Sequence, residues 1–148
     1  MKTKILICSV LFILMGLGSA SAQWAIGARF GGASGVSLKK YSYSGIDFEA
    51  IGAISFDDKA EGFGLTLMVE KFAQFTGDGK FGAILGVGET MVFADEFWFG
   101  VSGTLGLELR LGRIAIQGDW LPTLFFVDET YFTPVNGAVT ARWVFGGF

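Results

Sequence analysis

The chain has 148 residues, of which 51% are hydrophobic and 17% charged, and its formal net charge is −3. Basic residues form no cluster, so we expect no nucleic-acid partner. The chain contains no histidine and a single cysteine, which excludes the common metal sites and histidine-dependent catalysis, and we expect no cofactor.

The N-terminus has the pattern of a secretory signal. Two lysines precede an apolar run over residues 5–17, and small residues follow up to Ala22. This pattern predicts a cleaved signal peptide at residues 1–22, with residues 23–148 as a single exported domain. A lipoprotein signal, the alternative, is disfavoured because Cys8 lies near the start of the apolar run. Cleavage would remove the two lysines and take the net charge from −3 to −5.

The mature chain alternates between apolar and polar residues and contains no long apolar run. Successive side chains of a strand point to opposite faces, so this alternation predicts strands with one apolar and one polar face. We expect eight strands, over residues 23–31, 36–41, 45–56, 61–72, 80–93, 101–111, 114–122 and 135–145. Residues 124–134 are expected to form the longest outer loop.

Residues 101–120 carry the clearest hairpin. A two-residue turn in its middle fixes the register, which places Glu108 opposite Gln117 and Gly106 opposite Asp119. Eleven residues in a strand tilted by about 40° rise about 28 Å, close to the apolar thickness of a bilayer. Hydrocarbon demands that backbone groups be bonded internally, so a membrane protein without long apolar runs must be a closed barrel.

The predicted fold is therefore an all-β, eight-stranded antiparallel transmembrane up-and-down barrel in the bacterial outer membrane, surrounded by lipid. A soluble barrel with an apolar lumen is the alternative. Aromatic residues near the strand ends of the apolar face and nearly balanced charges on the polar face favour lipid outside. The polar face predicts a lumen ion-pair network of Arg29, Lys39, Asp47, Glu49, Glu70, Glu108, Arg110, Asp119 and Arg142.

One charged residue does not fit this pattern. Glu89 has the parity of the lipid-facing residues of its strand. Either it reaches the outer rim, or a bulge at residues 86–88 shifts the register by one residue and turns it inward.

Residues 106–111, 119–122 and 137–145 resemble the second half of a family of small outer-membrane barrel proteins. The architecture of that family is similar to those of OmpX and of the membrane domain of OmpA. The resemblance implies that barrel-assembly machinery recognises aromatic residues at the end of the chain, here Trp143, Phe145 and Phe148. Phe145 has the parity of the last strand, whereas Phe148 is one residue out of step. The outer turns are shorter than those of OmpX, so a role in adhesion does not follow.

The interior of an eight-stranded barrel is only wide enough to hold its own side chains, so the lumen charges are expected to form a plug. A narrow ion path along the same residues is the alternative. Asp47 and Glu49 are expected to be counter-ions rather than an acid–base pair, and residues 57–58 a solvated turn rather than a Ca²⁺ site. We expect no enzyme activity, because barrel enzymes that modify lipids rely on a histidine base; a lipid-modifying enzyme remains the third alternative.

Small residues interrupt the bulky apolar face. Such notches let lipid or another protein approach closely, although glycine also eases barrel curvature. The candidate notch residues are Ala50, Gly52, Gly103, Gly118 and Gly137. The sequence thus predicts a non-catalytic structural or accessory subunit that docks, by its wall or rims, to a larger outer-membrane complex.

Overall fold

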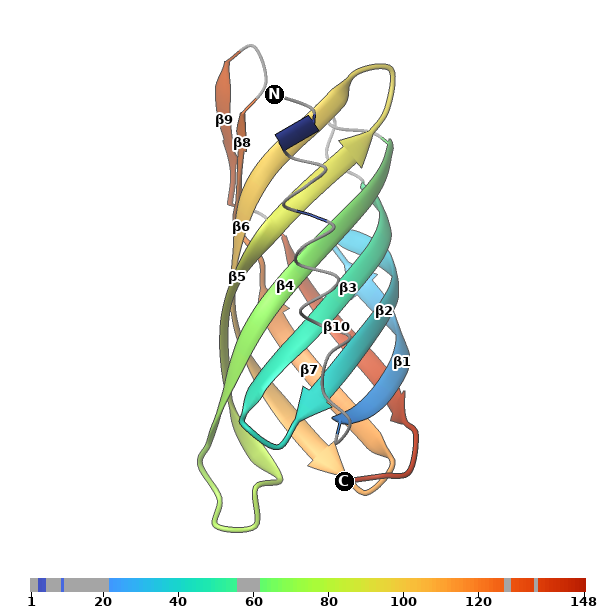
Figure 1. The fold of residues 1–148 in the computed structure, drawn as a ribbon, viewed down its shortest axis with the longest axis vertical. Coiled ribbons are helices and arrows are strands. Elements are labelled where there is room, and N and C mark those ends of the chain that lie inside the picture. Colours follow the sequence, from blue (N-terminus) through green and yellow to red (C-terminus); the bar gives the residue numbers. More distant parts are fainter. Residues whose placement is uncertain (1–2, 5–8, 10–21, 56–61, 127–128, 135) are drawn as a thin grey trace.

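A computed structural model describes residues 3–4, 9, 22–55, 62–126, 129–134 and 136–148. Most of the predicted signal peptide, the acidic turn at residues 57–58 and the first residue of the predicted last strand lie outside this part. Figure 1 shows that the described strands form one tall barrel. Among the described residues, no helix is long and apolar enough to cross a membrane.

The barrel is a single antiparallel sheet. Its strands are β1 (Ala22–Gly31), β2 (Ala33–Ser42), β3 (Ile46–Ser55), β4 (Gly62–Gln74), β5 (Phe81–Phe93), β6 (Phe97–Leu111), β7 (Ile114–Trp120), β8 (Thr123–Phe126), β9 (Thr130–Thr133) and β10 (Gly137–Val144). Strands β1 to β5 pair in chain order, β1 also pairs with β10, and the pairing of β5 with β6 closes the sheet.

Two of the eight walls of the barrel are built from two strands each. Strand β6 pairs with β7 and then with β8 in one continuous register. Between them Pro122 has no N–H to donate, but its carbonyl accepts a hydrogen bond from the Gly103 N–H at 3.0 Å. Strand β9 pairs with β8 and leads into β10, so β8 and β9 continue the walls of β7 and β10 to the end of the barrel opposite the C-terminus (Figure 1).

The predicted eight-stranded antiparallel barrel is confirmed, while the predicted outer loop at residues 124–134 is wrong because most of that stretch is a hairpin. The predicted pairings of Glu108 with Gln117 and of Gly106 with Asp119 are confirmed. Strand β5 pairs with both neighbours without interruption, so the bulge proposed at residues 86–88 is absent and Glu89 faces outward.

The barrel interior is layered along its axis. A cluster of Val92 and Phe125, with Trp98 and Tyr131 packed against it, fills the end that carries the β8–β9 hairpin. Further in lies an apolar layer, and the charged residues follow. At the end that holds Phe148, which we call the C-terminal end, a small cluster completes the filling. The inner apolar layer consists of Ile51, Ala53, Met68 and Leu121, and the last cluster of Ala25, Tyr41, Ala115 and Val144.

Candidate functional site

The charged layer is centred on Lys39 of β2. Its Nζ lies 2.6 Å from Glu70 Oε2 and 3.2 Å from Glu108 Oε2. It also donates a hydrogen bond to Gln117 Oε1 at 3.1 Å. All four side chains are buried, so one ammonium group links three different walls of the barrel.

Arg142 of β10 forms the second centre. Its guanidinium pairs with the Glu49 carboxylate, and its Nε donates to Ser37 Oγ at 2.8 Å. Nη1 donates to Gln117 Oε1 at 2.7 Å and lies 3.5 Å from Glu108 Oε2. Arg142 and Lys39 therefore share Glu108 and Gln117, which joins the two centres into one network.

A further ion pair, Arg29 with Asp119, lies further from the C-terminal end than the two centres do. Arg29 makes a two-point contact with Asp119, with Nη2–Oδ1 at 2.7 Å and Nη1–Oδ2 at 2.8 Å. Asp119 Oδ2 also accepts a hydrogen bond from Gln117 Nε2 at 2.9 Å, which ties this pair to the larger network. Planar two-point contacts of this kind are the strongest arginine–carboxylate geometry.

The structure places all nine residues of the expected network inside the barrel and joins each of them to at least one opposite charge. The joined residues are Arg29, Lys39, Asp47, Glu49, Glu70, Glu108, Arg110, Asp119 and Arg142. Ser37, Tyr41 and Gln117 also belong to the network but were not among the predicted site residues. Their inward parity, at the height of the charged residues, is the signal that identifies them.

Glycines on the inward face make room for these long side chains. A Cβ at Gly27 would lie 2.6 Å from Arg142 Cγ. At Gly86 it would lie 2.6 Å from the Val69 carbonyl oxygen and 2.8 Å from Glu70 Cγ. The packed lumen thus depends on walls that lack side chains at these positions.

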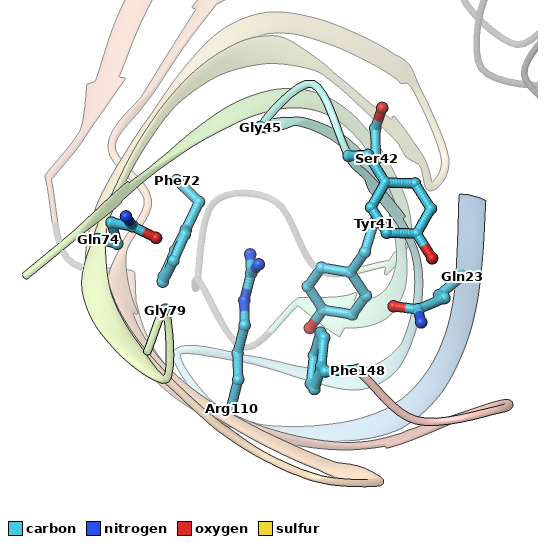
Figure 2. Close-up of a pocket in the computed structure, with 10 residues that line it drawn as sticks. Gln23, Tyr41, Ser42, Gly45, Phe72, Gln74, Gly79, Arg110 and Phe148 are labelled. Carbon is cyan, nitrogen blue, oxygen red and sulfur yellow. The ribbon is translucent and has the colours of Figure 1, made fainter. Parts of the chain in front are cut away.

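Aromatic rings line the C-terminal end of the lumen around Arg110 (Figure 2). The guanidinium Cζ lies 3.6 Å from the Phe72 ring centre and 5.2 Å from that of Phe148. The same group contacts Glu108 at 2.7 Å and Asp47 at 3.0 Å, so its charge is already compensated. The space around these residues is a cavity of about 300 Å³ that opens at this end.

The last residues turn back toward the lumen. Gly146 and Gly147 adopt positive φ angles of 86° and 75°, a conformation that favours glycine. The Phe148 ring therefore packs edge-on against Tyr41, with centres 4.9 Å apart. Phe145 instead faces outward and is 55% exposed, close to the outward-facing Trp143 of β10.

A chain of hydroxyl groups crosses four neighbouring walls on the other side of the inner apolar layer. Thr66 and Thr90 are linked at 2.9 Å, Thr90 and Ser102 at 2.6 Å, and Ser102 and Thr123 at 2.7 Å. The three threonines of this chain line a cavity of about 50 Å³. Each hydroxyl has a protein partner, so the polar groups satisfy one another within the wall.

The five candidate notch residues do not form one hollow. Ala50 and Gly52 lie on β3, away from the other three on β6, β7 and β10. Gly103 and Gly118 are on neighbouring walls but are separated by the Leu105–Trp120 pair. A Cβ at Gly118 would meet nothing within 4 Å, whereas one at Gly52 would lie 3.5 Å from the Phe63 ring.

Within the described residues, no group of three or more carboxylate, cysteine or histidine side chains could hold a metal ion. The carboxylates buried in the lumen contact the side chains of lysine and arginine. Comparisons with protein-family models, curated proteins and solved structures give no match.

Proposed function

We propose that this protein is a non-catalytic integral barrel of the bacterial outer membrane that acts as a structural or accessory subunit of a larger outer-membrane complex. The main observation in support is the distribution of side chains across the wall. Leu107 is 49% exposed, whereas its neighbour Glu108 is fully buried in the lumen. The apolar exterior suits a lipid environment, and the charges are compensated inside.

The filled lumen favours a role for the outer surface. Apolar, charged and aromatic layers follow one another along the axis, which disfavours a narrow pore. The inward carboxylates contact lysine or arginine, which disfavours their use as acid and base in a lipid-modifying enzyme. The walls and rims then remain for contacts with lipid and with other proteins.

Insertion by barrel-assembly machinery is part of this proposal, in line with the resemblance to the small OmpX-like barrels. Phe145 is the better candidate for recognition, because its ring lies outside the barrel while Phe148 is turned into the mouth.

The proposal is tested by purifying the protein from native outer membranes in mild detergent. We expect co-elution with another outer-membrane protein at a constant ratio in size-exclusion chromatography. A barrel that always elutes alone contradicts the proposal. A stable conductance in planar bilayers, changed by Glu108→Gln or Arg110→Gln, would favour the pore instead.

A further inference from the structure

Charged residues are rare on the outward face of the described strands, where they are Lys40, Lys71 and Glu89. The two lysines lie toward the C-terminal end, and Lys40 Nζ is 5.6 Å from the Trp24 ring centre. Lys71 is exposed, and a lysine near the membrane edge can extend its amine to the polar surface, whereas Lys40 is only 3% exposed and packs beside Trp24. Glu89 lies further from the end of its strand than the two lysines do, and its side chain is shorter than that of lysine.

The depth of Glu89 follows from a row of aromatic rings near the opposite end. Phe93 packs with Phe63 and Phe97, with ring centres 6.5 and 5.4 Å apart. Rows of this kind mark the membrane interface in outer-membrane barrels. Glu89 precedes Phe93 by four residues, which in a tilted strand is a drop of about 10 Å. The carboxyl group therefore lies below the interface.

The Glu89 carboxyl has apolar neighbours. Leu67 and Val101 lie directly opposite it on the two adjacent strands. Its Oε1 is buried and accepts no hydrogen bond from the described residues. A polar group without a partner is costly in hydrocarbon, so an ionisable residue at this depth marks a functional site.

A hollow lies beside this carboxyl. Val87 is paired with Gly103, and the next outward pair along the strands is Glu89 with Val101. A Cβ at Gly103 would have its nearest neighbours, Gly86 O and Pro122 Cγ, at 3.9 Å. The wall thus offers a carboxyl group and a shallow depression side by side.

The same wall also contacts another part of the chain. Ser9 Oγ lies 3.8 Å from Met91 Sδ, and Met91 is only 7% exposed while Val87 is 59% exposed. Ser9 belongs to the predicted signal peptide, so cleavage would uncover this position. Leu67, on the neighbouring strand, is likewise only 5% exposed.

These observations extend the proposed function, on which the following inference rests. We infer that Leu67, Val87, Glu89, Val101 and Gly103, here called the Glu89 wall, bind a membrane-spanning segment of another outer-membrane protein. A lysine or arginine of that segment pairs with the Glu89 carboxyl, and an apolar side chain fills the hollow at Gly103. Charge complementarity selects this occupant, because lipid chains and apolar segments leave the carboxyl without a donor.

Photocrosslinking in native outer membranes tests the inference. A benzoylphenylalanine replaces Val101 in the Glu89 wall or, as the control, Val139 on β10, which is also outward-facing. We expect a protein adduct from position 101 whose peptide belongs to a membrane strand with a lysine or arginine. Glu89→Leu should reduce this adduct at least fivefold, whereas Glu129→Leu, outside the wall, should not. Glu89→Lys should also abolish it, and reversing the charge of the partner's basic residue should restore it.

The outcomes separate this inference from the proposed function. Glu89→Leu removes a charge from an apolar face, so the barrel should remain folded, as heat-dependent gel migration would show. Protein adducts at position 139 only, or adducts at 101 with lipid, with this chain itself or insensitive to Glu89→Leu, would overturn the inference and leave the proposed function standing. A lack of protein adducts from both positions would overturn the inference, and co-elution in mild detergent would then decide the proposed function, because contacts at the rims would remain.

Discussion

Individual lumen residues are held in place by partners that are distant in the sequence. Arg142 contacts Glu49, and Arg29 contacts Asp119, so each pair joins walls from different parts of the chain. A buried ion pair adds little net stability compared with an apolar pair, but removal of one partner leaves an uncompensated charge. The contribution of a lumen residue to stability should therefore be measurable mainly when that residue is replaced and its partner is kept.

Replacement of Arg142 should show this effect. Arg142→Met leaves Glu49 without its arginine, so the free energy of unfolding in lipid vesicles should fall by about 3 to 5 kcal/mol. Adding Glu49→Gln should recover part of the loss. Lys80→Met, at the exposed Lys80–Asp78 pair, is the control and should cause no measurable change. An Arg142→Met barrel as stable as the parent in urea titration would contradict the network.

The inward and outward glycines should respond differently to an added methyl group. Gly86→Ala would place it 2.6 Å from the Val69 carbonyl oxygen, and we expect a loss of about 1 to 3 kcal/mol from overpacking. Gly118→Ala is the matched control, because the added methyl group would have no neighbour within 4 Å. Urea unfolding of both variants measures the difference, and equal stabilities would show that the lumen is loosely filled.

Strands β7 and β8 behave as one element despite the proline between them. Pro122 lacks a donor, but its carbonyl continues the ladder and β8 resumes the same register. The hairpin of β8 and β9 brings Phe125 over the lumen, where Trp98 meets its ring at 5.8 Å. Most of residues 124–134, which the sequence pattern predicted as an outer loop, thus form a hairpin that covers that end of the lumen.

Loss of the Phe125 ring should open this end to small solutes. With a cysteine at the buried Thr90 as reporter, Phe125→Ala should increase the rate of labelling by a water-soluble maleimide roughly tenfold, because the cover of the lumen is gone. Phe126→Ala removes the neighbouring outward-facing ring and should leave the rate unchanged. Equal labelling rates in the two variants would mean that other side chains close this end.

The alternation of side chains predicted most elements, because parity alone decides which face of a strand is apolar. It could not predict the β8–β9 hairpin, because a proline such as Pro122 is typical of the end of a strand. Nothing in the local sequence indicates that pairing resumes after it. It also could not decide the position of Glu89, which depends on uninterrupted pairing with both neighbouring strands. The inward turn of Phe148 depends on two glycine conformations rather than on strand periodicity.

At the scale of the whole molecule, the barrel separates an apolar exterior from an interior whose charged groups compensate one another. The separation holds from the Trp24 end of β1 to the exposed Phe30 near its other end. The lumen residues that share one parity in the sequence do lie together, but their individual partners follow from barrel curvature and shear, which a linear pattern does not encode.

Fluorescent labels should report this separation directly. A bimane label on Leu107→Cys should be quenched by brominated lipid, because this outward side chain would contact acyl chains. The same label on the inward Thr104→Cys is the control and should be quenched by less than a third as much. Quenching at position 104 alone, or a mature chain that is freely soluble without detergent, would contradict a membrane barrel.

The cross-lumen contacts also bear on how the chain can assemble. Arg142 and Asp119 come late in the chain, yet their partners Glu49 and Arg29 are made early. An unfinished sheet would hold guanidinium and carboxylate groups apart, exposed to whatever fills its open side. The pairs Arg142–Glu49 and Arg29–Asp119 can form only when β1 and β10 meet and the barrel closes. Half-closed intermediates should therefore be scarce, and insertion should proceed as a single cooperative event.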